Sequence, residues 1–204
     1  MKNGMKALLI AVSAVLLVAI SVGLTVAYFT DKEEVVNVFT VGKVDISLDE
    51  EGAEENEDGT YGQTYDDIVP GEVYPKAPTV TVEEGSLESY VRVIVTVKFE
   101  QAIDEELTGE KLDNIFVNVS DKWVLNAKTV ADDFTSVEYE YRYATTVAAP
   151  DAAVELEPIF TDVTFDGEAW GNELACLNNM HINVEGHAIQ AFSFADADEA
   201  WSKF

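Results

Sequence analysis

The sequence predicts an all-β protein, a jelly-roll-like β-sandwich with short peripheral helices. Several segments alternate apolar and polar residues with a period of two, which is typical of half-buried strands. These segments are short, turn residues separate them, and helical periodicity is rare between them. Many short strands with little helix indicate a sandwich or jelly roll around one hydrophobic interior. Hydrophobic residues make up 48% of the chain, which is enough to build that interior.

Residues 1–27 have the features of a secretory signal peptide. Lys2 and Lys6 form a basic start, and an uncharged apolar run follows from Ala7 to the small residue Ala27. Cleavage after Ala27 makes Tyr28 the first residue of the mature chain. The competing interpretation is a retained anchor, because a run of about 20 apolar residues can span a bilayer. Contact with a membrane is expected only through an uncleaved signal.

The segment 28–48 predicts one or two strands, with Gly42 as a kink, because it is rich in β-branched and aromatic residues. A free extended end of this kind can add as a strand to the open sheet edge of another molecule. Repeated head to tail, that contact makes a filament. The alternative, in which the segment pairs with its own domain as an ordinary first strand, stays open. The apolar candidates for the donor strand are Tyr28, Phe29, Val35, Val36, Val38 and Phe39.

Residues 49–204 are predicted to form the sandwich domain. The part from Asp49 to Gly59 is dense in carboxylates, and we expect a mobile acidic loop there. Its carboxylates allow weak calcium binding, but the ordered spacing of an EF-hand is absent, so no cofactor is expected. Pro70 and Gly71 predict a break in the chain.

The strands and helices of this domain can be assigned from local patterns. Thr164–Trp170, which reads TFDGEAW, predicts two strands joined by a turn at Asp166 and Gly167. Helices are expected from Ala102, with Asp104 as the N-cap, and over 195–204. The clearest strand patterns include Val80 and Val82, span 91–99, and begin at Val137 and at Met180.

Charge and cysteine content exclude several classes of protein. The net charge of −27 repels phosphate backbones and anionic lipid, so neither nucleic acid nor a lipid surface is an expected partner. The single cysteine, Cys176, allows no intramolecular disulfide. Its apolar neighbours Leu174 and Leu177 predict a buried, inert thiol.

No motif indicates catalysis, and the chain is not expected to be an enzyme. The weak candidates for metal ligands are His181 and His187, the only two histidines. On a regular strand they would share one face but lie roughly 20 Å apart, too far to bind one metal. A bulge at Glu185 or Gly186 would be needed to bring them together. The GxSxG elbow, the P-loop and GxGxxG are absent from the sequence.

Three blocks, taken in order, resemble the TasA and camelysin family of Gram-positive bacteria. The first is an apolar signal with AYFTD and then FTVGKVDISL, the second is DIVPGE with TVTVEEGSLESYVRVIVTV, and the third is HAIQAFSFADADEAW. The resemblance implies a sandwich fold and export by a dedicated signal peptidase of the SipW type. It therefore implies a secreted protein, located in the extracellular matrix or at the cell surface.

The same resemblance implies a structural role in biofilm matrix fibres. Each subunit would bind the next by donor-strand exchange, with Tyr28 to about Thr40 in the groove of its neighbour, and an accessory matrix protein is a possible partner. Two alternatives remain: a camelysin-like cell-surface metallopeptidase, and a monomeric surface-binding module.

Overall fold

The computed structural model describes residues 43–50, 54–55, 61–65, 68–177, 179–192 and 194–204. These residues all belong to one unit, Gly42–Phe204. The candidate signal peptide, the cleavage position at Ala27 and the candidate donor residues 28–39 lie outside the described residues. In the part of the chain that is described, no helix has the length and apolar character needed to cross a bilayer.

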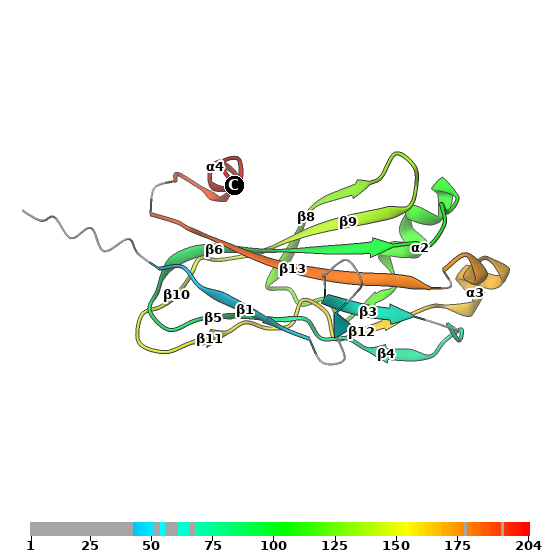
Figure 1. The fold of residues 1–204 in the computed structure, drawn as a ribbon, viewed down its shortest axis with the longest axis horizontal. Helices are drawn as coiled ribbons and strands as arrows, with labels where there is room; N and C mark the ends of the chain where they lie inside the picture. Colours follow the sequence, from blue (N-terminus) through cyan, green and yellow to red (C-terminus); the bar gives the residue numbers. More distant parts are fainter. Residues whose placement is uncertain (1–42, 51–53, 56–60, 66–67, 178, 193) are drawn as a thin grey trace, which may run out of the picture. The chain divides into compact units, whose positions relative to one another are not determined.

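The larger sheet of the sandwich has seven strands (Figure 1). Six of them follow the order β2-β3-β13-β6-β9-β8, and β10 pairs with the beginning of β6. The long strands β6 and β13 lie at the centre and pair antiparallel from Lys98↔His181 to Ser89↔Gln190. The strand bounds are β2 Glu54–Glu55, β3 Tyr61–Tyr65, β6 Ser86–Lys98, β8 Trp123–Val130, β9 Ser136–Tyr143, β10 Val147–Ala149 and β13 Met180–Gln190.

Two three-stranded sheets form the second layer, in the orders β1-β5-β11 and β4-β12-β7. All of their pairings are antiparallel. The ring of Phe116 on β7 packs edge-on against Tyr139 on β9, with ring centroids 5.3 Å apart, so this layer faces the larger sheet. The strand bounds are β1 Ile46–Asp49, β4 Val73–Pro75, β5 Thr79–Val82, β7 Phe116–Val117, β11 Val154–Glu155 and β12 Asp162–Thr164.

The hydrophobic core lies between the two layers. Alternate residues of β6 from Val91 to Val97 are fully buried, as are Val80 and Val82 of β5. These are the apolar positions of the period-two patterns in the sequence. The described residues therefore confirm the predicted all-β sandwich-like fold.

The helices are short and lie in the connections between strands. The helical insertion predicted from Ala102 consists of two short helices, separated at Gly109. Asp104 directly precedes the first helix, but its side chain makes no capping hydrogen bond. The C-terminal helix is confirmed, and Asp196 caps it by accepting a hydrogen bond from the Glu199 N–H at 2.9 Å. The bounds are η1 Glu105–Thr108, α2 Glu110–Asp113, α3 Gly167–Trp170, η2 Gly171–Leu177 and α4 Ala197–Trp201, where η marks a 3₁₀-helix.

The predicted hairpin at TFDGEAW is wrong. Strand β12 ends at Thr164, and α3 begins at Gly167. Asp166 Oδ1 accepts a hydrogen bond from the Glu168 N–H at 2.8 Å, so the Asp-Gly pair starts a helix instead of a two-residue turn. Pro70 and Gly71, in contrast, form the predicted break before β4.

The predicted acidic loop over 49–59 is partly wrong. Asp49 is the last residue of β1, paired with Thr79, and Glu54 and Glu55 form β2 beside β3. Residues 51–53 and 56–59 lie outside the described part of the chain. The predicted buried thiol is only half-buried: Cys176 lies in η2, and burial raises its pKa, which favours the unreactive thiol form.

Candidate functional site

The larger sheet has an incomplete edge along the second half of β13. On one side β13 pairs with β6 over 181–190, whereas on the other side it pairs with β3 only from Met180 to Asn183. Among the described residues, no strand continues β3 along Val184–Gln190. This stretch of β13 is the sheet edge that we consider as a candidate binding site.

The backbone groups on this edge follow from the pairing of β13 with β6. The Ala191 N–H donates to the Glu88 carbonyl oxygen at 2.8 Å. Along an antiparallel strand, the backbone N–H and C=O groups of successive residues bond alternately to the strands on its two sides. His187 and Ile189, like Ala191, therefore bond to β6. Gly186 and Ala188 therefore direct their N–H and C=O groups toward the incomplete edge. Such a row of backbone groups is a template for an added strand.

Small side chains cover the core beside this edge. Gly186 faces strand β1 across the two layers, and a Cβ placed on it would lie 3.4 Å from Ile46 Cδ1 and 3.7 Å from Val80 Cγ2. Ile46, Leu48 and Ala188 pack against the core but remain partly exposed. An incoming strand that places apolar side chains here would complete the burial of these residues.

The two histidines do not come together. His181 and His187 both lie on β13, and the register with β6 runs without a bulge through Glu185 and Gly186. Six residues of regular strand separate them by roughly 20 Å, as expected from the sequence. Within the described ranges, no group of three or more His, Cys, Asp or Glu side chains is placed to bind a metal ion.

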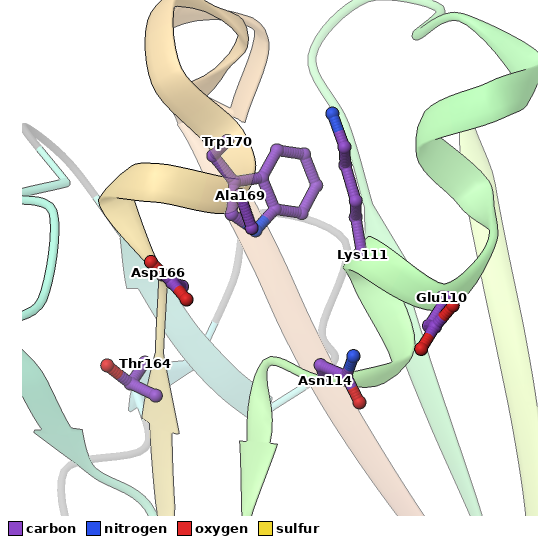
Figure 2. A pocket seen from close by; sticks show the side chains of 7 residues that line it. All are labelled: Glu110, Lys111, Asn114, Thr164, Asp166, Ala169 and Trp170. Atoms are coloured by element: carbon purple, nitrogen blue, oxygen red, sulfur yellow. The ribbon is translucent and has the colours of Figure 1, made fainter.

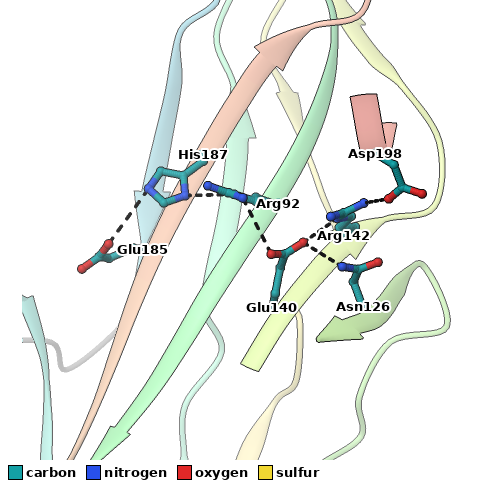
Figure 3. A network of polar contacts seen from close by, with 7 residues as sticks. All are labelled: Arg92, Asn126, Glu140, Arg142, Glu185, His187 and Asp198. Carbon is teal, nitrogen blue, oxygen red and sulfur yellow. Dashed lines mark hydrogen bonds and ion pairs between the residues drawn. The ribbon is translucent and has the colours of Figure 1, made fainter. Parts of the chain in front are cut away.

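His187 instead belongs to a polar network on the outer face of the larger sheet (Figure 3). Arg92 Nε donates to His187 Nδ1 at 3.3 Å, and Arg92 also pairs with Glu140. Glu140 accepts from Arg142 Nε at 2.5 Å, and Arg142 reaches Asp198 of α4 at 2.5 Å.

The same network holds the C-terminal helix on the sheet. The Arg92 guanidinium lies over the rings of Trp201 and Phe204, 4.4 and 4.8 Å from their centroids. Arg92 and Arg142, the only arginines in the sequence, thus both fasten α4 to the larger sheet. We read this network as structural, because each charged group in it already has a partner within the domain.

The network predicts a pH-dependent stability. Burial lowers the pKa of His187, and the neighbouring Arg92 lowers it further, while Glu185 and Glu140 act against the shift. A histidine whose pKa is lower in the folded state takes up its proton more readily when unfolded, so stability falls as the pH drops below about 6.5. We expect His187→Gln to reduce this loss of unfolding free energy, measured by urea denaturation between about pH 7.5 and 5.5.

The control for this experiment is His181→Gln on the same face of β13. It should keep the pH dependence of the unmodified protein, because His181 lies far from Arg92 along the strand. Equal flattening of the profile by both substitutions would contradict the assignment to His187.

A separate pocket of about 260 Å³ lies between α2 and α3 (Figure 2). Two of its charged residues have partners, Lys111 with Glu173 and Asp166 with the first turn of α3, and Glu110 is the third charged residue of the lining. The Trp170 side chain that lines it is almost fully buried. Sequence patterns gave no sign of this pocket, because α3 was expected to be part of a hairpin.

Comparison with known protein families identifies the N-terminal half of the chain. The family model described as camelysin metallo-endopeptidase matches residues 4–102. Over these residues the chain is similar to the camelysin family. The family predicted from the sequence is thereby confirmed. Comparisons with curated proteins and with solved structures gave no match.

The camelysin match covers the N-terminal segment and strands β1 to β6, and it ends before β7. Both histidines and the cysteine therefore lie outside the matched residues. A zinc centre in a peptidase needs three protein ligands, usually including histidine, around one metal. The described residues do not fit this requirement, so we assign no catalytic step to a metal.

Proposed function

We propose that this chain is a secreted structural subunit of extracellular matrix fibres. In the fibre, residues 28–40 of one subunit add as a strand to the β13 edge of the next. The observation that carries the proposal is the incomplete edge Val184–Gln190, with Gly186 and Ala188 beside the partly exposed Ile46 and Leu48. The candidate donor segment is rich in the β-branched and aromatic residues that suit such an edge.

The proposed interface is heterologous, because a donor segment and an acceptor edge are different surfaces of the same chain. Contacts of this kind do not close unless the rotation between subunits returns to the start, so they extend into a filament. The partners are therefore further copies of the chain, the signal peptidase that frees Tyr28, and an accessory matrix protein that starts the fibre. Nucleic acid is not a partner of such an acidic surface.

The direct test compares a chain that starts at Tyr28 with one that starts at Gly42. Both keep all the described residues of the sandwich, and only the first keeps the donor segment. Size-exclusion chromatography and negative-stain microscopy over several days should show filaments for the longer chain and monomers for the shorter one. Filaments of both chains, or of neither, would reject the donor role; monomers that bind cell-wall material in a pull-down would favour a surface-binding module.

A second candidate function is that of a cell-surface metallopeptidase, which the description of the family favours. We expect no zinc-dependent cleavage of casein by the chain that starts at Tyr28, because His181 and His187 lie too far apart to bind one metal. The assay compares added zinc with a chelator, and uses a His181→Ala, His187→Ala double variant as the control. Turnover that the chelator abolishes and the double variant lacks would establish the peptidase.

A further inference from the structure

Lys76 is a buried lysine at the junction of the two smaller sheets. It lies between β4 and β5, its backbone N–H donates to the Thr161 carbonyl oxygen at 3.1 Å, and its side chain is 0% exposed. Lysine side chains are almost never fully buried unless they are paired. We therefore expect the ammonium group of Lys76 to have a specific acidic or hydrogen-bonding partner.

The partner is Glu50, the residue that directly follows β1. Its carboxylate contacts Lys76 Nζ, and its side chain is only 5% exposed. Among the described residues, neither Lys76 Nζ nor Glu50 Oε1 has any other hydrogen-bond partner. A buried ion pair is stable only when further hydrogen bonds satisfy the two charged groups, and these two atoms have none among the described residues.

Another lysine of the domain shows how a structural ammonium group is usually satisfied. Lys128 Nζ donates to the Thr108 carbonyl oxygen at 2.6 Å, pairs with Asp113, and lies 5.3 Å from the centre of the Tyr139 ring. Its charge is thus surrounded by acceptors and partly reaches solvent. Lys76 has none of these additional acceptors among the described residues, so its environment favours an uncharged amine.

The protonation state of the pair follows from its burial. Removal from water lowers the pKa of Lys76 to about 7, since burial penalises the charged amine. Transfer of one proton from the ammonium group to the Glu50 carboxylate leaves a neutral amine beside a neutral carboxylic acid. This is the pair of species that can condense, because only the unprotonated amine is a nucleophile and only the protonated acid has a suitable leaving group.

We propose that Lys76 and Glu50 form an intramolecular amide bond in the folded protein. The Nζ lone pair attacks Glu50 Cδ to give a tetrahedral intermediate. The C–O bond to one carboxyl oxygen then breaks, that oxygen takes up the proton released by Nζ, and one water leaves. No oxidant, reductant or cofactor takes part, and the products are one amide and one water.

Two physical effects drive this condensation. Groups held in contact react with effective concentrations that reach about 10⁵–10⁸ M in well-oriented cases. The buried site also excludes the water that would hydrolyse the product. The resulting cross-link joins the end of β1 to the β4–β5 connection, in a chain whose single cysteine cannot form an internal disulfide. It does not depend on fibre assembly.

Peptide mapping of the full-length chain, purified after export, tests the cross-link. Without it, trypsin cuts after Lys43, Lys76 and Arg92 and releases the separate peptides 44–76 and 77–92. With it, Lys76 is no longer a cleavage site, and a single peptide 44–92 is expected with a mass about 18 Da below its sequence mass, the mass of one water. A glutamate-specific protease then cuts within the ring between residues 50 and 76, and the two segments that carry Glu50 and Lys76 stay joined by the amide.

The matched control within the same digest is the close ion pair Lys111–Glu173, whose side chains are 37% and 50% exposed. Trypsin should cut normally after Lys111, because water reaches that pair. In Lys76→Arg and in Glu50→Leu, the mass deficit should disappear. Release of peptide 44–76 at its full mass from the folded, unmodified protein would overturn the proposal, and this result does not require either variant to fold.

Discussion

The substitution Ala188→Pro is expected to abolish filament formation while leaving the monomer folded. Ala188 directs its N–H toward the incomplete edge of β13, since the neighbouring positions bond toward β6. Proline removes that donor, and its ring occupies the space that an added strand needs. Proline is tolerated where the missing N–H belongs to an unpaired edge, so the bonds of β13 to β6 should remain.

The matched control is Ala188→Ser, which keeps the backbone N–H and should still form filaments. A complementation experiment separates the two halves of the interface. A chain starting at Tyr28 with Ala188→Pro can only donate, and an unmodified chain starting at Gly42 can only accept. Mixed together, they should form a 1:1 complex that does not extend, as measured by light scattering coupled to size exclusion. Filaments of the Ala188→Pro chain alone would show that the acceptor lies elsewhere.

The substitution Phe160→Ala is expected to have the largest effect on stability. Phe160 is fully buried between the layers, and its ring packs 4.7 Å from that of Phe116, centroid to centroid. Removal of a buried phenyl ring loses its transfer free energy and leaves a cavity, which together cost about 3–5 kcal/mol. Urea denaturation followed by tryptophan fluorescence should show this decrease in the free energy of unfolding.

The control for the core substitution is Phe192→Ala, the same change at a ring that is 93% exposed. Because surface substitutions of this kind usually change stability by less than about 0.5 kcal/mol, the two variants should differ clearly. If Phe192→Ala proved as destabilising as Phe160→Ala, the exposed position assigned to Phe192 would be wrong.

The fold was predictable because its strands carry a strong local pattern. The alternation from Val91 to Val97 places every second side chain in the core, and no other regular structure has this period. The turn at Pro70 and the C-terminal helix also follow from local residue chemistry. The structure of TFDGEAW does not follow from local residue chemistry, because an Asp-Gly pair is compatible with both a hairpin turn and the start of a helix. Only the packing of the surrounding segments decides between the two.

The candidate acceptor edge could not be predicted, because it depends on which strands become neighbours. Nothing in Val184–Gln190 indicates that β3 ends opposite Asn183. The pairing of Glu50 with Lys76 was equally hidden: Glu50 belongs to a run of acidic residues whose typical interpretation is a solvated surface. Both features arise from contacts between residues that are distant in the sequence.

The central position of β13 determines when the domain can fold. Its partners β3 and β6 come early in the chain, and β13 itself comes near the end, so its pairings join residues such as Thr64 and His181. The larger sheet stays divided until residues 180–190 are available. Proteins dominated by such long-range pairings fold slowly, since loops must close before the contacts that stabilise them form. The chain therefore cannot complete the larger sheet until most of it has been synthesised.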